Sequence, residues 1–207
     1  MPHPAPDLQI HGPEDLPALV DTLVAVWTEA HSADPAVFAA GFTPEALRRQ
    51  VGGHAGHDTF TLVTAHDEGG NCTGFAYGFL CTPEYWYGPD LLPAIPAGQR
   101  TATRLAGICE IAVRRAEQGR GTGTLLHDVL LERLRPEWAS LLALPGSASQ
   151  RFYDRLGYTR MGAYRPDDDS ASLDLLACRV QERGDGSMGE KRISPSLRDG
   201  TETSSSD

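Results

Sequence analysis

Residues 106–134 read AGICEIAVRRAEQGRGTGTLLHDVLLERL, and they combine an apolar segment, a glycine-rich loop and a second segment with apolar residues at helical spacing. The first eight residues are apolar except for one carboxylate, Glu110, and this pattern predicts a buried strand. A glycine-rich loop follows at 118–124. The last eleven residues carry apolar side chains at helical spacing, and Pro136 ends that pattern: Leu125, Leu126, Val129, Leu130 and Leu134. We therefore predict a strand, a loop and a helix in succession.

The segment that follows this helix completes a larger unit. Residues 139–144 read ASLLAL and predict a second buried strand. A strand, a helix and another strand in this order form a βαβ unit, whose two strands run parallel and are joined by a right-handed crossover. We therefore expect the strands at 106–113 and 139–144 to lie in one sheet.

The glycine-rich loop has the physical properties of a phosphate cradle. Gly119, Gly121 and Gly123 tolerate positive φ and let a ligand approach the backbone. The helix after the loop offers unpaired N–H groups and the positive end of its dipole to an anion. A dinucleotide-binding fingerprint would need glycine where Thr124 stands, and a Walker loop would need a lysine, but the sole lysine is Lys191. A glycine-rich turn without a ligand is the alternative.

The residues before this unit predict further alternating elements. Hydrophobic spacing and turn signals indicate a strand at 8–10, helices at 16–27 and 44–51, and strands at 59–65 and 72–80. The turn at 67–71 joins the last two strands as a hairpin. Gly74, Ala76 and Gly78 form a face of small residues, against which another element or a ligand would lie closely. Residues 81–104, with four prolines, predict a long irregular connection.

The composition limits the possible classes of protein. With 207 residues, 40% of them hydrophobic, the chain suits one domain, which we place at 1–180. Residues 181–207 lack aromatic residues and periodicity, so we expect a disordered C-terminal tail. No apolar run is long enough for a membrane helix. The net charge of −10 counts against nucleic acid or anionic lipid as a partner and favours a cationic substrate.

Cysteine and histidine spacing predict neither a disulfide framework nor a metal site. The four cysteines form no C-x-x-C pair, and the first residues lack the basic and apolar regions of a signal peptide. We therefore expect free thiols and a cytoplasmic location. His54 and His57 lie in a glycine-rich segment without a third ligand nearby, so no metal is expected there.

Two motifs together resemble a known superfamily. Residues 118–123 read QGRGTG and fit the pattern Q/R-x-x-G-x-G/A, and SQRFYDRLGY follows at 149–158. In this order and spacing the motifs resemble the GNAT superfamily of acyl-CoA-dependent N-acyltransferases, over about residues 107–162. Two positions depart from the family pattern. Arg115 stands where proline is frequent, and Gly146 or Ser147 stands where asparagine is frequent.

The resemblance implies both a fold and an activity. The fold would be a mixed α/β structure with a mostly antiparallel sheet of six to seven strands, flanked by about four helices. Its two central parallel strands would splay around the pantetheine arm of the cofactor. The activity would be transfer of an acetyl group from acetyl-CoA to a primary amine, by direct attack in a ternary complex and without a metal. The acceptor could be a small molecule or a peptide, and a homodimer is a family-level expectation. A non-catalytic acyl-CoA-binding or regulatory module is the alternative.

The resemblance also implies roles for particular residues. The pyrophosphate loop of the family maps onto seven consecutive positions, mostly through their backbone N–H groups: Gln118, Gly119, Arg120, Gly121, Thr122, Gly123 and Thr124. The strand backbone at Ile111, Ala112 and Val113 would hydrogen-bond the pantetheine. Tyr153 matches the tyrosine that protonates the leaving thiolate. The alternative for Tyr153 is core packing beside Phe152.

Glu110 is the candidate for the general base. An amine must be neutral to attack a thioester, so some group must accept its proton. Glu110 and Ile111 alternate along the strand, so the carboxylate faces away from the side that Ile111 occupies. A carboxylate in so apolar a strand requires a reason, because unpaired burial is costly. Glu110 could accept the proton of the amine, bind the amine, or form a salt bridge to an arginine.

Overall fold

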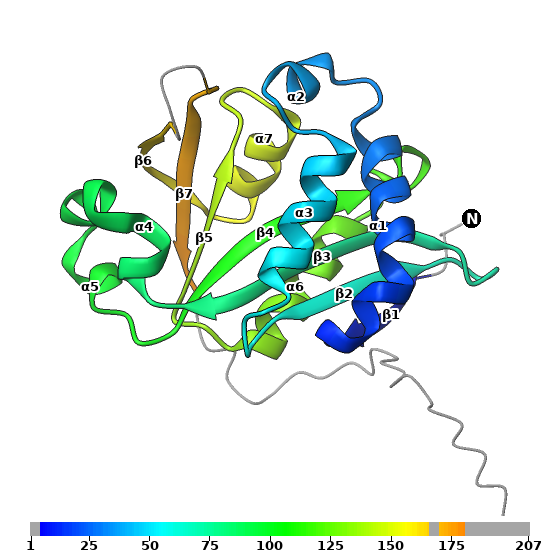
Figure 1. Cartoon of the computed structure of the whole chain (residues 1–207), viewed down its shortest axis with the longest axis horizontal. Helices are drawn as coiled ribbons and strands as arrows, with labels where there is room; N and C mark the ends of the chain where they lie inside the picture. The colour runs from blue at the N-terminus through cyan, green and yellow to red at the C-terminus, as the bar shows by residue number, and fades with distance from the viewer. Residues whose placement is uncertain (1–4, 166–169, 181–207) are drawn as a thin grey trace, which may run out of the picture.

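The computed structural model describes residues 5–165 and 170–180, and its centre is a seven-stranded sheet with helices on both faces (Figure 1). The spatial order is β1-β2-β3-β4-β5-β7-β6. All neighbouring strands are antiparallel except β4 and β5, which run parallel as the βαβ pattern predicts. The strands are β1 (Asp7–His11), β2 (Thr61–His66), β3 (Cys72–Cys81), β4 (Leu105–Val113), β5 (Trp138–Ala143), β6 (Thr159–Tyr164) and β7 (Leu173–Arg179). The predicted mixed sheet is confirmed.

The predicted helices at 16–27, 44–51 and 124–134 are present and cover opposite faces of the sheet. One face carries α1 (Leu16–His31) and α3 (Pro44–His54), whereas α6 (Thr122–Leu134) packs on the other face against β2, β3 and β4. A further helix, α7 (Ala148–Arg155), contributes Tyr153 to the core on the α6 side. Thr43 caps α3 by accepting a hydrogen bond from the N–H of Ala46 at 3.1 Å, as its position before Pro44 predicts.

The expectation of an irregular connection at 81–104 is wrong. This segment forms α4 (Pro83–Leu91), a 3₁₀ turn at Leu92–Ala94 and α5 (Ala97–Arg100). Thr82 caps α4, and Pro83 stands in its first turn, where the missing N–H of proline does no harm. The chain bends at Gly88, whose φ is +63°. Pro83 and Pro93 stand in the first turns of short helices, whereas Pro89 follows the bend inside α4. One more short helix, α2 (Pro35–Ala39), and 3₁₀ turns at Pro13–Asp15 and Arg115–Glu117 complete the elements.

Alternation along the strands divides the core into two layers. Ala76 and Ile111 pack with the layer under α6, whereas Tyr77 and Ala112 belong to the layer under α1 and α3. The face of small residues on β3 lies under α6, and a Cβ atom on Gly74 would lie 3.1 Å from Cδ1 of Leu126. Gly74 and Ala76 therefore accommodate α6, whereas Gly78 accommodates the close approach of the Gly107 backbone in β4.

Several expectations concern features outside this core. The predicted tail at 181–207 lies outside the described residues. No helix in the described part of the chain is both long and apolar enough to cross a membrane. The four cysteines are free thiols. Within 5–165 and 170–180, no three His, Cys, Asp or Glu side chains gather in a way that could hold a metal ion.

Candidate active site

A gap opens in the middle of the sheet between the two parallel strands. β4 and β5 pair only where they begin, at Leu105–Trp138, Ala106–Ala139 and Gly107–Ser140. Beyond these pairs β4 continues to Val113 and β5 continues to Ala143 without a mutual register. The expected splay of the central strands is therefore confirmed.

A β-bulge in β4 lies where the two strands separate. Tyr77 of β3 lies opposite Glu110, whereas the next residue, Gly78, lies opposite Ile108. Cys109 is therefore an extra residue in β4. A bulge of this kind bends its strand and increases the local twist, so it directs the end of β4 away from β5.

The main chain of β4 presents polar groups to this gap. The N–H of Arg114 donates to the carbonyl of Thr73 at 2.8 Å, so residue 114 faces β3. Successive residues of a strand direct their N–H and C=O groups to opposite sides. Ile111 and Val113 therefore face the gap, whereas the main chain of Ala112 faces β3. The carbonyl of Val113 accepts from Nε2 of Gln118 at 2.9 Å, and this bond connects the strand to the loop.

The glycine-rich loop leads from β4 to α6 and leaves open space before the helix. Gly119 and Gly121 have φ of +74° and +87°, a region that only glycine adopts without strain. A Cβ atom at either position would meet no heavy atom within 4 Å. Gly121 is also the N-cap of α6 and provides no side-chain cap. The first N–H groups of α6 are therefore available to an anion.

Side chains around the loop hold it against the rest of the domain. Arg114 forms an ion pair with Glu29 at the end of α1 and donates from Nε to the carbonyl of Cys72 at 2.8 Å. Arg120 forms an ion pair with Glu117 at 2.9 Å within the loop itself. The remaining loop positions, 122–124, form the first turn of α6. Thr122 is buried, Thr124 is half-buried, and a Cβ atom on Gly123 would lie 3.4 Å from the ring of Phe152.

Glu110 projects from β4 towards α1, on the face opposite α6. Its Oε2 accepts a hydrogen bond from Nε1 of Trp27 at 3.0 Å. Burial raises the pKa of this carboxyl group to about 7, although hydrogen bonds from Trp27 and from the N–H of Ile111 oppose that change. The arginine salt bridge considered above does not form among the described residues, because the partner is the indole. The sequence indicated Trp27 only as the last residue of the helix predicted at 16–27, although a buried indole N–H requires an acceptor.

Tyr153 lies in the core on the other face of the sheet, in the layer under α6. It is buried, and its ring packs against those of Phe152 and Tyr158, at centroid distances of 5.1 and 5.3 Å. Burial, together with the negative charge of Glu110, raises the pKa of Tyr153 well above its ordinary value, so the phenol is protonated. Within the described part of the chain its hydroxyl has no hydrogen-bond partner. The core packing considered for Tyr153 is real, yet it leaves the hydroxyl available.

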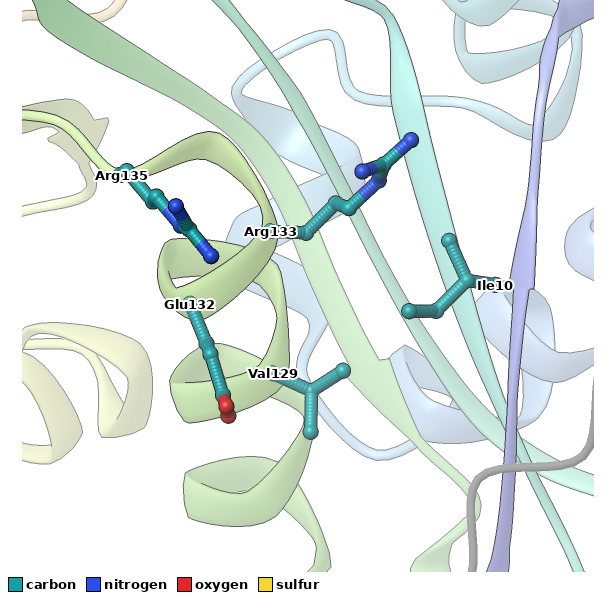
Figure 2. A pocket seen from close by; sticks show the side chains of 5 residues that line it. All are labelled: Ile10, Val129, Glu132, Arg133 and Arg135. Atoms are coloured by element: carbon teal, nitrogen blue, oxygen red, sulfur yellow. The ribbon is translucent and has the colours of Figure 1, made fainter. Parts of the chain in front are cut away.

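A separate hollow lies at the far end of α6 (Figure 2). Its volume is about 420 Å³, and its lining consists of Ile10, Val129, Glu132, Arg133 and Arg135. Gly121 lies eleven residues from Glu132 along the helix, which corresponds to about 16 Å. This hollow therefore belongs neither to the glycine loop nor to the gap between β4 and β5.

The splayed parallel strands and the glycine loop define the class of protein. The chain belongs to the Acetyltransferase (GNAT) family, whose sequence model matches residues 23–158. It is therefore an acyltransferase. Members of this family generally use acetyl-CoA and act on amines of proteins or small molecules. No protein of curated function matches the chain in sequence.

Solved structures show the same fold at low sequence identity. A protein from Corynebacterium glutamicum described as histone acetyltransferase HPA2 and related acetyltransferase is 20% identical, with a TM-score of 0.56, covering 87% of this chain and 99% of the other. Ard1 from Thermoplasma volcanium is 17% identical, with a TM-score of 0.56 and coverages of 86% and 100%. The PaiA N-acetyltransferase from Thermoplasma acidophilum, solved in complex with coenzyme A, is 11% identical, with a TM-score of 0.52 and coverages of 84% and 99%.

Proposed function

We propose that the protein transfers an acetyl group from acetyl-CoA to a primary amine, by direct attack in a ternary complex. The observation that carries this proposal is the separation of β4 and β5 after Gly107, together with Glu110 on one face of β4 and Tyr153 on the other, close enough for the charge of Glu110 to raise the pKa of Tyr153. The two side chains are a proton acceptor and a proton donor, and acyl transfer to an amine needs both.

The residues around the gap suit the donor that the family uses. The open positions at Gly119 and Gly121 and the uncapped N–H groups of α6 would hold the pyrophosphate. The main chain of Ile111 and the N–H of Val113 would bond the amides of the pantetheine arm. In this proposal the side chain of Gln118 fixes the loop to β4 through its hydrogen bond to Val113, and residues 120–124 bind the pyrophosphate through their backbone N–H groups.

The two side chains divide the proton transfers of the reaction. The amine nitrogen forms a bond to the carbonyl carbon of the thioester as the carbon–sulfur bond breaks. Glu110 accepts the proton that the amine loses, and its pKa of about 7 suits a base that works near neutral pH. Tyr153 gives its proton to the sulfur and regains one from solvent. Trp27 acts as a positioning residue, because it holds the carboxylate of Glu110.

Thermal unfolding with saturating acetyl-CoA tests the binding part of this proposal. A ligand at a hundred times its Kd stabilises the native state by about 2.7 kcal/mol, which corresponds to roughly 5–10 °C for a domain of this size. We expect such an increase with acetyl-CoA and little with ADP. An equal increase with ADP would favour a general nucleotide site, and no increase with either would contradict the proposal. Binding without thiol release over a panel of amines would favour the non-catalytic alternative.

The substitution Tyr153→Phe tests the acid. It keeps the ring packing and removes only the hydroxyl, which makes no hydrogen bond among the described residues, so the fold should be unaffected. We expect kcat to fall by roughly a factor of 10 to 100, because general acid catalysis is lost, with the Kd of acetyl-CoA unchanged. Steady-state thiol release and calorimetric titration measure the two quantities. Equal losses in kcat and in affinity would show that Tyr153 serves binding and not proton transfer.

A further inference from the structure

A second, apolar hollow lies on the same side of the sheet as Glu110. Its volume is about 240 Å³, and none of the described residues that line it carries a charged side chain. One wall comes from α4, with Tyr85, Trp86 and Leu91, and the other from the strands, with Leu142, Tyr164 and Leu175. Figure 1 shows α4 beside β7, which agrees with this lining. We propose that this hollow binds an aromatic ring or a compact apolar group of the acceptor amine, an inference that rests on the acyl transfer proposed above.

Two contacts place the hollow relative to the gap. Leu141 packs in the core under α6, so its neighbour Leu142 faces the opposite side, towards α1 and α4. The indole of Trp86 lies directly against Gly107, where any side chain would collide with the ring. Glu110 and Gly107 lie on the same face of β4, opposite Tyr77 and Phe79, so about 7 Å of strand separates them. A substituent two to four bonds from the amine nitrogen would span this distance.

The exposed apolar side chains of the protein gather at this hollow. The structure describes four large apolar residues that are exposed, and three of them line it: Tyr85 at 58%, Leu142 at 39% and Tyr164 at 37%. Scattered exposed apolar residues need no explanation, but a cluster around a concavity indicates a binding surface. The described lining consists of aromatic rings, leucine side chains and one glycine, which favours an apolar bound group.

Hydrogen bonds hold the aromatic walls in place. The hydroxyl of Tyr87, another lining residue, accepts a hydrogen bond from the amide of Gln99, which is completely buried. The hydroxyl of Tyr85 lies 3.1 Å from Nε2 of His57, whose ring stacks on Phe79. The walls are therefore preorganised, and a volume of about 240 Å³ suits one ring better than a peptide or an oligosaccharide.

The first test uses the wild-type protein and three amines. Thiol release is measured at saturating acetyl-CoA with 2-phenylethylamine, ethylamine and 1,5-diaminopentane as acceptors. We expect the KM for 2-phenylethylamine to be at least about tenfold lower than for either other amine, because only it fills the hollow. Equal KM values would overturn the inference and leave acyl transfer intact. Preference for the diamine would also overturn it, because the rings would then serve a second cation.

The second test uses Leu142→Asp, with the same change at Leu131 as control. Leu131 is also a partly exposed leucine, but it lies on α6, away from the hollow. We expect Leu142→Asp to raise the KM for 2-phenylethylamine at least about tenfold, and Leu131→Asp to leave it unchanged. Tyr164→Ala should act in the same direction as Leu142→Asp.

The stabilisation by acetyl-CoA shows whether each variant is folded and separates the two proposals. Loss of the preference for 2-phenylethylamine with the stabilisation retained would support the inference. No thiol release and no stabilisation in the wild type would overturn the proposed function and the inference together. If Leu142→Asp changed only the association state and not the KM, the hollow would be a contact between copies of the chain, and the inference would be wrong.

Discussion

Replacing Glu110 with glutamine should lower kcat at pH 8 by at least about a hundredfold, because the amine then has no base to accept its proton. Glutamine is the matched change, since its side-chain oxygen still accepts the hydrogen bond from Trp27. In the wild type, kcat/KM should fall about tenfold per pH unit below pH 7, as the carboxylate becomes protonated. The variant should lack this limb, and pH profiles of thiol release measure the difference.

The same substitution should stabilise the fold at alkaline pH. Folding raises the pKa of Glu110 from its ordinary value of 4.5 to about 7, so the charged form is less favourable in the native state than in the unfolded chain. Glu110 therefore lowers the free energy of unfolding. This loss is absent below pH 4.5, grows between pH 4.5 and about 7, and is complete above pH 7. Because the carboxylate keeps some contact with solvent, we expect a gain on the order of 2 kcal/mol for Glu110→Gln at pH 8, and little at pH 4.

Trp27→Phe distinguishes a base from a merely structural carboxylate. The indole N–H favours the ionised form of Glu110, so its loss should raise the pKa of that carboxyl group further. The fall of kcat/KM at low pH should therefore begin at a higher pH in Trp27→Phe than in the wild type. In Glu110→Gln this fall should be absent. Identical pH profiles for Glu110→Gln and the wild type would contradict the role of Glu110 as base.

Gly121→Asp should abolish the stabilisation by acetyl-CoA, reducing a shift of roughly 5–10 °C to less than about 1 °C. The φ of +87° strains any side chain at this position, and the open space beside Gly121 would receive a carboxylate where the proposal places the pyrophosphate. The loss of affinity should be at least about a hundredfold. Thermal unfolding with and without acetyl-CoA measures it, and calorimetric titration gives the Kd.

Gly70→Asp is the control for strain and charge. Gly70 has a φ of +78°, an added Cβ atom there would also meet no heavy atom within 4 Å, and it lies in the hairpin between β2 and β3. Gly70→Asp should lower the unfolding temperature of the free protein about as much as Gly121→Asp does. It should leave the stabilisation by acetyl-CoA unchanged. If both variants kept that stabilisation, the loop at 118–124 would not be the pyrophosphate site.

The elements that carry the site were predictable because their signals are local. The apolar run at 106–113, the glycines before α6 and the helical spacing after them each depend on neighbours within a few residues. The start of α3 after Thr43 is a local signal of the same kind, because a threonine directly before Pro44 can accept a hydrogen bond from the first turn. In residues 81–104 the prolines hid short helices, since proline in a first turn and proline in a loop look alike in sequence.

Local sequence could not predict how the elements meet. The bulge at Cys109 arises from the register between β3 and β4, and it lies where β4 leaves β5. Trp27 and Glu110 are 83 residues apart, and the hydrogen bond between them depends on where α1 crosses the sheet. Nothing in the spacing of Tyr85 or Leu142 indicated that they would line one hollow.

The sequence by itself determined the family, the order of the sheet elements in the site, the anion-binding character of the loop and the face on which Glu110 lies. Each of these depends on backbone conformation or on side-chain period, and both are properties of short segments. Only the tertiary structure decided that the parallel strands separate after Gly107, that an indole holds the carboxylate and that α4 builds an apolar wall beside it. These features are contacts between distant segments, and packing of the whole domain determines them.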